Sequence, residues 1–191
     1  MRMTKRMTIH SIAGYCSEKA LWKLLVDLIT DALRNRSESW RVLTPDHVIV
    51  DGEDFHVDSH ISSEPFTEFV PPEGIENYGE PGYIWSLGAL VCYASSGHFI
   101  FGGRGGAYQR NKPKVELPTL RKEHSNLDII IKRCLCYSSS QRITLNELLE
   151  LAQKGLESNN QKDRIKQSNE SGTAIVSSSF TTYESWPEKM D

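Results

Sequence analysis

The chain has 191 residues and a formal net charge of −3, and 38% of its residues are hydrophobic and 25% charged. This length and composition fit one soluble domain with some additional chain, and they exclude a collagen, a wholly disordered protein and a disulfide-rich miniprotein. Because the chain has no net basic charge, its electrostatics favour a protein partner over nucleic acid.

The cysteines indicate a reduced, cytoplasmic protein without a zinc site. They are scattered along the chain, and their only close pair has the spacing C-x-C, whereas zinc sites use pairs of the form C-x-x-C. Residues 1–14 contain no long apolar stretch ahead of a cleavage site, so we expect no signal peptide. The cysteines are Cys16, Cys92, Cys134 and Cys136.

The first strong element is a helix over residues 18–34, which Ser17 can cap at its N-terminus. It is apolar on most sides, as expected of a helix in a core. Residues 48–50 and 55–57 then flank a turn at residues 51–52 and predict a small β-hairpin. The prolines that follow, up to Pro81, prevent a long helix in that stretch.

Residues 82–101 contain no Lys, Arg, Asp or Glu, and the run is about as long as a helix that spans a membrane. Ser95, Ser96 and Gly97 interrupt it, which is typical of a buried helix that ends in a turn. We therefore expect a core helix over residues 82–94 and no membrane insertion.

Glycines cluster at residues 102–106, which predicts a mobile surface loop. A phosphate-binding loop is the alternative, but neither a strand pair nor a Gly-Lys-Ser/Thr helix start flanks the cluster. Two shorter helices are expected near residues 125–136 and 144–154. The second begins with a capping box, in which Thr144 and Glu147 each satisfy a free backbone N–H.

After residue 155 the composition becomes polar and rich in serine. We therefore divide the chain into an N-terminal extension at residues 1–14, a domain at residues 15–156 and a flexible tail at residues 157–191. The expected fold class is mainly α, of the α+β type.

His56, Asp58 and His60 occupy every second position, so an extended strand would place all three on one face. Such a set could bind a metal ion. A solvated strand face explains the same pattern, because Phe55 and Val57 alternate with these residues and would point inward. We favour the solvated face and keep the metal site as the alternative.

Four segments of the chain, in order, resemble the C-terminal lobe of a eukaryotic-type protein kinase. The segments are WRVLTPDHVIVD at residues 40–51, similar to the catalytic-loop pattern HRDLKPENILLD; FVPPE at 69–73, similar to the APE segment; IWSLG at 84–88, similar to the D-x-W-S-x-G start of the central helix; and residues 133–149, similar to the closing pattern of the lobe. The resemblance implies a helical C-terminal lobe with a small β-hairpin and no N-terminal lobe. It also implies a partly buried, bidentate ion pair between Glu73 and Arg142.

The resemblance does not extend to the catalytic chemistry. Val42 stands at the position of the catalytic Asp, Thr44 at that of the loop Lys, and His47 at that of the metal-binding Asn. Of a D-F-G segment only Asp58 remains, and no Gly-rich loop or V-A-I-K lysine precedes the domain. Tyr83 replaces the Asp that, in the family, tethers the catalytic loop to the central helix. We therefore expect neither enzyme activity nor a cofactor.

Residues 17–25, SEKALWKLL, resemble the start of the KIND module, the kinase non-catalytic C-lobe domain. This resemblance implies a pseudokinase-like scaffold that binds a protein or peptide without catalysis. The alternative is a residual nucleotide-binding or kinase-related activity, completed by another chain.

Aromatic residues in the tail suggest a linear docking motif. The expected partner contacts are Lys23, Asp27, Asp31, His60, Arg104, Arg110, Tyr183 and Trp186.

Overall fold

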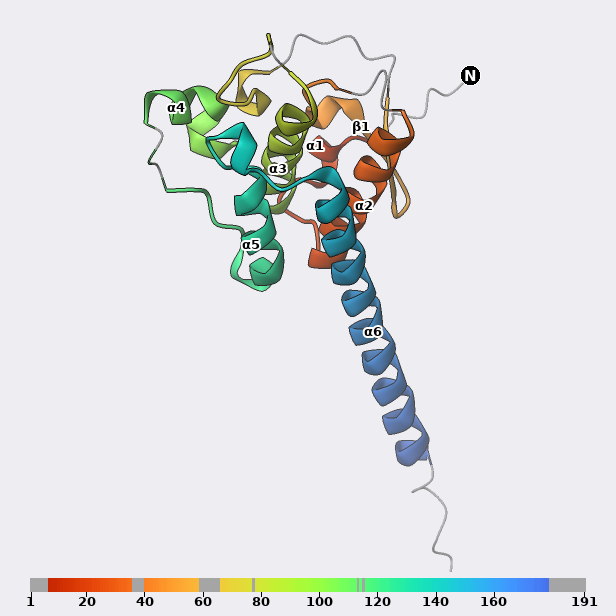
Figure 1. The fold of residues 1–191 in the computed structure, drawn as a ribbon. Coiled ribbons are helices and arrows are strands. Elements are labelled where there is room, and N and C mark those ends of the chain that lie inside the picture. Colours follow the sequence, from red (N-terminus) through yellow and green to blue (C-terminus); the bar gives the residue numbers. More distant parts are fainter. Residues whose placement is uncertain are drawn as a thin grey trace, which may run out of the picture. The chain divides into compact units, whose positions relative to one another are not determined.

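A computed structural model describes residues 7–35, 40–58, 66–76, 78–112, 114 and 116–178, with side chains as far as residue 168. The chain divides into two compact units, Met1–Leu156 and Glu157–Asp191. The described residues form six α-helices, short 3₁₀ turns and one two-stranded antiparallel sheet (Figure 1), which confirms a mainly helical α+β fold. The elements are α1 (Ile9–Ile12), α2 (Glu18–Arg34), β1 (Val48–Asp51), β2 (Asp54–Val57), α3 (Glu80–Ser96), α4 (Gly105–Asn111), α5 (Ser125–Cys134) and α6 (Leu145–Ser178).

Helix α2 begins and ends where the sequence predicts. The Ser17 hydroxyl accepts a hydrogen bond from the Ala20 amide at 3.2 Å and so caps the helix. Its apolar side is buried against α3, and the β-hairpin packs on its other side. In the hairpin, Ile49 lies opposite His56 and Val50 opposite Phe55, with the turn between Asp51 and Asp54.

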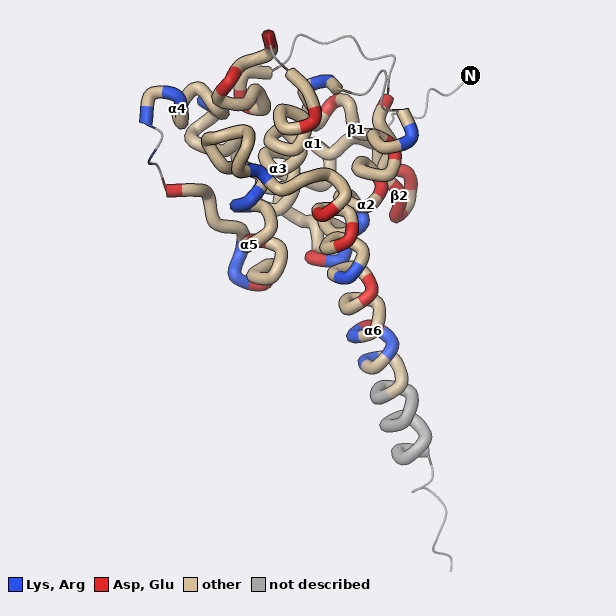
Figure 2. Tube along the Cα trace, in the orientation of Figure 1, with Lys and Arg blue, Asp and Glu red and all other residues tan. Residues whose placement is uncertain are grey.

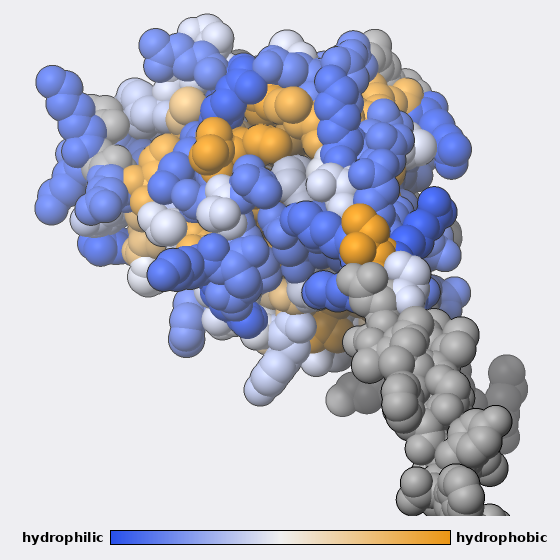
Figure 3. All heavy atoms as spheres, turned by 90° about the horizontal axis from the view of Figure 1, so that it is seen from below, coloured by the Kyte–Doolittle hydropathy of each residue, from blue (hydrophilic) through white to orange (hydrophobic). Residues whose placement is uncertain are grey.

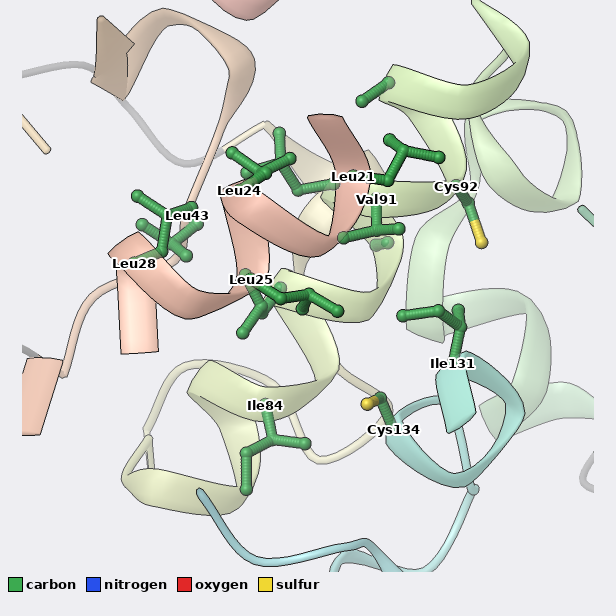
Figure 4. Packing of buried hydrophobic residues seen from close by; sticks show 14 of the residues in the cluster. Leu21, Leu24, Leu25, Leu28, Leu43, Ile84, Val91, Cys92, Ile131 and Cys134 are labelled. Carbon is green, nitrogen blue, oxygen red and sulfur yellow. The ribbon is translucent and has the colours of Figure 1, made fainter. Parts of the chain in front are cut away.

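Helix α3 is the centre of the core, because every residue from Gly82 to Ser95 is buried. Figure 4 shows its Ile84 and Val91 among leucines of α2 on one side and Ile131 and Cys134 of α5 on the other. Gly88 permits the contact with α5, since a Cβ there would lie 2.8 Å from the Cβ of Cys134. None of the described helices is long and apolar enough to cross a membrane.

The N-terminal segment belongs to the packed unit, so the predicted extension at residues 1–14 was too long. Ile9 of α1 is fully buried, and Thr8 forms a β-bridge with Ile49. The Gly14 amide donates to the Ala94 carbonyl at 2.9 Å, which ties this segment to the end of α3. Four helical residues give too short a periodic pattern to be recognised in a sequence.

The glycine cluster is a site of close packing, and the predicted mobile loop was wrong for its second half. Gly105 and Gly106 are buried at the start of α4, and the Gly106 amide donates to the Val70 carbonyl at 2.9 Å. A Cβ on Gly106 would overlap the backbone at Pro71 and Pro72. Two glycines therefore bring the backbone of α4 into contact with the segment that precedes Glu73.

Helix α6 is much longer than predicted. It runs to Ser178, so residues 157–178 are helical where we expected a flexible tail. No proline occurs in this stretch and many of its residues are Glu, Gln, Lys and Arg, which favour a helix once it has begun.

Half of the capping box predicted at the start of α6 is present. The Glu147 amide donates to the Thr144 hydroxyl at 3.3 Å, while the Glu147 carboxylate pairs with Arg133 at 2.7 Å.

Candidate functional site

The predicted ion pair between Glu73 and Arg142 is present and bidentate. Nη1 of Arg142 lies 2.6 Å from Oε1 of Glu73, and Nη2 lies 2.7 Å from Oε2. The guanidinium also donates to the carbonyls of Pro81 at 2.8 Å and Cys136 at 2.9 Å, and its side chain is only 1% exposed. One arginine therefore joins the Pro-Pro-Glu segment, the start of α3 and the loop that precedes α6.

The three loop positions singled out from the sequence lie inside the molecule. Val42, Thr44 and His47 are buried, and Thr44 is fully so. The Thr44 hydroxyl lies 3.2 Å from Nδ1 of His47, and the His47 carbonyl accepts the Asp58 amide at 2.8 Å. Burial, reinforced by the positive charge of Arg41, lowers the pKa of His47 below its ordinary value. Thr44 and His47 are therefore buried and do not line an open cleft.

A tether between the loop and α3 exists, although at a residue the sequence did not single out. The Leu43 amide donates to the Ser86 hydroxyl at 3.3 Å, and the Ser86 hydroxyl lies 2.8 Å from that of Tyr78. Tyr83 donates its hydroxyl to the Leu28 carbonyl of α2 at 3.0 Å. Ser86 lies in the segment IWSLG at residues 84–88, where the sequence alone assigned the serine no role.

The hairpin packs against the polar side of α2, where the side chains of Lys23 and Asp27 are 27% and 18% exposed. Nζ of Lys23 lies 2.6 Å from carboxylate oxygens of both Asp27 and Asp54. The Asp27 carboxylate also accepts the Phe55 amide of β2 at 3.0 Å. Although burial opposes it, the two carboxylates raise the pKa of Lys23. These bonds fasten the hairpin to the helix.

Asp31 remains beside a shallow groove between α2 and β2, with a volume of about 370 Å³. Its carboxylate accepts a hydrogen bond from the side-chain amide of Asn35 at 2.9 Å. The groove mixes charged, polar and apolar side chains. The residues that line it are Val26, Asp27, Thr30, Asp31, Arg34, Asp54, Phe55, His56 and Val57.

The structure gives the alternating histidine pattern in part. On β2, Phe55 is buried and His56 is exposed, as a solvated strand face requires. His60 lies outside the described residues, so the structure does not show the three residues as a set. Among the residues that the structure does describe, no group of three His, Cys, Asp or Glu side chains could hold a metal ion.

Two histidines make contacts between distant residues that had no signal in the sequence. Nδ1 of His10 lies 2.8 Å from the Tyr93 hydroxyl, and Nε2 lies 3.2 Å from a carboxylate oxygen of Asp46. In the core, Nδ1 of His124 lies 2.9 Å from the Ser95 hydroxyl. Each histidine joins segments that are far apart in the chain and close only in the fold.

The remaining predicted contacts are distributed between α4 and the tail. Arg104 and Arg110 are exposed, the first at the start of α4 and the second within it. Tyr183 and Trp186 lie outside the described residues. Hydrophilic side chains cover most of the face in Figure 3, with hydrophobic ones in separate patches.

The comparisons with known proteins give no family. A scan against models of protein families found no match to this sequence, and a search of curated proteins found no significant relative.

Proposed function

We propose that the Met1–Leu156 unit is a non-catalytic protein-interaction module of the kinase C-lobe type, similar to the KIND module. The observation that carries this proposal is the state of the loop at residues 42–47. Phosphoryl transfer needs a carboxylate at the first of these positions and a metal ligand at the last, both open to substrate. Here they hold Val42 and His47, which are buried, and Thr44 bonds to His47 in the interior.

Two further features support the type of module. The Glu73–Arg142 pair joins the two motifs that the kinase resemblance connects. Ser86 ties the loop backbone at Leu43 to the central helix without serving a catalytic side chain. A loop that is held in place but has lost its reactive groups is suited to packing and to contact with a partner.

The test has a binding arm and a nucleotide arm. In the first arm, the full chain captures partners from a lysate of its own cells, and the best-enriched protein is then purified. We expect this purified protein to bind the folded chain stoichiometrically, with a dissociation constant below about 10 μM in calorimetry. The heat-unfolded chain is the control, and equal binding to it would contradict a folded interaction module.

In the second arm, thermal unfolding is followed with and without ATP and Mg²⁺. A nucleotide at one hundred times its dissociation constant would stabilise the fold by about 2.7 kcal/mol. We expect no shift at millimolar nucleotide and no transfer of phosphate. A shift accompanied by ATP turnover would overturn the proposal in favour of a residual kinase-related activity.

A further inference from the structure

The segment around α4 differs in charge from the rest of the chain. Residues 99–115 hold four of the 22 cations and none of the 25 acids, so the remaining residues carry a net charge of −7. In Figure 2 the charged positions marked along α4 and at its ends are blue, the colour of Lys and Arg. Positive charge is therefore concentrated on α4, through Arg110, and on the residues that flank it, Arg104, Lys112 and Lys114, in an otherwise acidic chain.

Two of these cations gather at a single aromatic ring. The guanidinium carbon of Arg104 lies 4.2 Å from the centre of the Tyr108 ring, and Nζ of Lys112 lies 5.7 Å from it. Arg104, Tyr108 and Lys112 are spaced at intervals of four positions, so their side chains lie along one side of the helix. We call this set, Arg104, Tyr108 and Lys112, the Tyr108 face.

Among the described residues, the cations of the Tyr108 face differ from several others in the fold in having no acidic partner. Lys23, Lys132 and Arg142 each lie within 2.8 Å of a carboxylate oxygen. Within the described ranges, neither Arg104 nor Lys112 has a carboxylate at ion-pair distance. Arg104 donates through Nε to the Phe101 carbonyl at 3.2 Å. This bond orients the guanidinium and leaves Nη1 and Nη2 for a bidentate bond to an anion.

The backbone before α4 is strained in a way that supports this arrangement. Phe101 has a φ of 51°, a left-handed conformation that residues other than glycine rarely adopt. Its ring is stacked on Tyr108 with 5.3 Å between the ring centres. Strain of this kind persists at ligand sites when the surrounding structure holds it. Here the Phe101 ring contacts Tyr108, and the Phe101 carbonyl accepts a hydrogen bond from Nε of Arg104.

We propose that the Tyr108 face binds an acidic peptide segment, with one carboxylate on the Nη atoms of Arg104 and a second on Nζ of Lys112. The proposal rests on the proposed interaction function and gives the partner its chemistry. A seven-residue helix is about 10 Å long, which matches a few peptide residues. The negative charge elsewhere on the chain disfavours a long polyanion such as RNA.

The direct test measures the fluorescence anisotropy of labelled peptides with the full chain at low salt. One peptide alternates glutamate with serine, and its matched control has glutamine at every glutamate. We expect the acidic peptide to bind and the neutral one not to bind. Arg104→Gln and Lys112→Gln should each weaken binding about tenfold, and added salt should weaken it further.

Arg110→Gln is the matched control variant. Arg110 is on the same helix and also donates through Nε to a carbonyl, that of Pro72 at 2.8 Å. It lies two positions from Tyr108 and so on the opposite side of the helix. Removing its charge should change the affinity less than about twofold. An equal loss in all three variants would show a general charge effect and overturn the Tyr108 face as a site.

Two further outcomes would also overturn this inference. One is no binding of the acidic peptide, and the other is stronger binding of a single-stranded oligonucleotide than of the peptide. Neither result affects the proposed function if the purified partner still binds, because that partner would then use another surface. If no purified partner binds the folded chain but the acidic peptide still does, the result counts against the proposed interaction module and not against the Tyr108 face.

Discussion

Arg142 holds both carboxylate oxygens of Glu73 across 69 positions of the sequence, and its guanidinium is almost completely buried. Arg142→Ala should therefore lower the free energy of unfolding by about 3 kcal/mol, because several carbonyls and the Glu73 carboxylate lose their donor, while the carboxylate, with its side chain 25% exposed, keeps some contact with water. Urea unfolding followed by circular dichroism measures the change.

The exposed pair of Arg133 and Glu147 provides the control for this prediction. Its nitrogen and oxygen are 2.7 Å apart, yet both side chains are nearly half exposed. Arg133→Gln should cost less than about 1 kcal/mol. If Arg142→Ala cost no more than that, Arg142 would not hold the three segments together.

Stability should fall as the pH is lowered from about 7 to about 5.5, because two histidines are buried in their neutral form. Burial lowers the pKa of His124 below the ordinary value of 6.5, and it does the same for His47. In this window the unfolded chain binds more protons than the folded chain, so protonation favours unfolding. The urea midpoint at several pH values measures the effect.

His124→Gln should flatten this pH dependence, since glutamine does not titrate. His56→Gln, which changes an exposed side chain on β2, is the matched control and should leave the slope unchanged. The same slope in His124→Gln as in the wild type would show that His124 does not contribute.

Gly106→Ala should destabilise the protein by about 1–3 kcal/mol, although alanine ordinarily favours a helix over glycine by about 1 kcal/mol. The reason is steric, because the new Cβ would overlap the backbone at Pro72. Ala107→Gly, at the exposed neighbouring position, tests helix propensity alone and should cost about 1 kcal/mol. A stabilised Gly106→Ala variant would mean that α4 is free to move away.

The thiols should react in two phases with a disulfide reagent. Cys136 is partly exposed, whereas Cys92 and Cys134 are buried. Burial raises the pKa of Cys92 to about 12 and that of Cys134 further, which keeps both as unreactive thiols. Only Cys136 should react quickly in the folded chain, and Cys136→Ser should remove that phase. Rapid loss of two or more thiols in this variant would contradict the burial of α3 against α5.

The sequence predicts the elements that local patterns define. Helix α2 has a capping serine and a long apolar side, and the hairpin has alternating residues around an Asp-Gly turn, so both lie where expected. The Glu73–Arg142 contact could be expected only from a resemblance between motifs, because no local pattern links positions so far apart.

The contacts that the sequence did not predict depend on tertiary packing. In a sequence, a glycine that allows two backbones to pack closely cannot be distinguished from a glycine in a mobile loop. The role of Gly105 and Gly106 was therefore not predicted. The burial of Thr44 and His47 depends on how the loop is held, and Ser86 of α3 does part of that. The Tyr108 face required a left-handed Phe101, which propensity does not anticipate.

The contact between Gly106 and the Pro71-Pro72 segment has a thermodynamic consequence for recognition at α4. Because the helix backbone is locked against residues that lead directly into Glu73, the helix cannot reorient without disturbing the buried ion pair. A ligand that meets such a surface has no helix to order, so little of its binding free energy is lost to conformational entropy. A ligand that binds α4 only in the folded state should thus raise the melting temperature of the Met1–Leu156 unit, to which α4, the Pro71-Pro72 segment and the ion pair all belong.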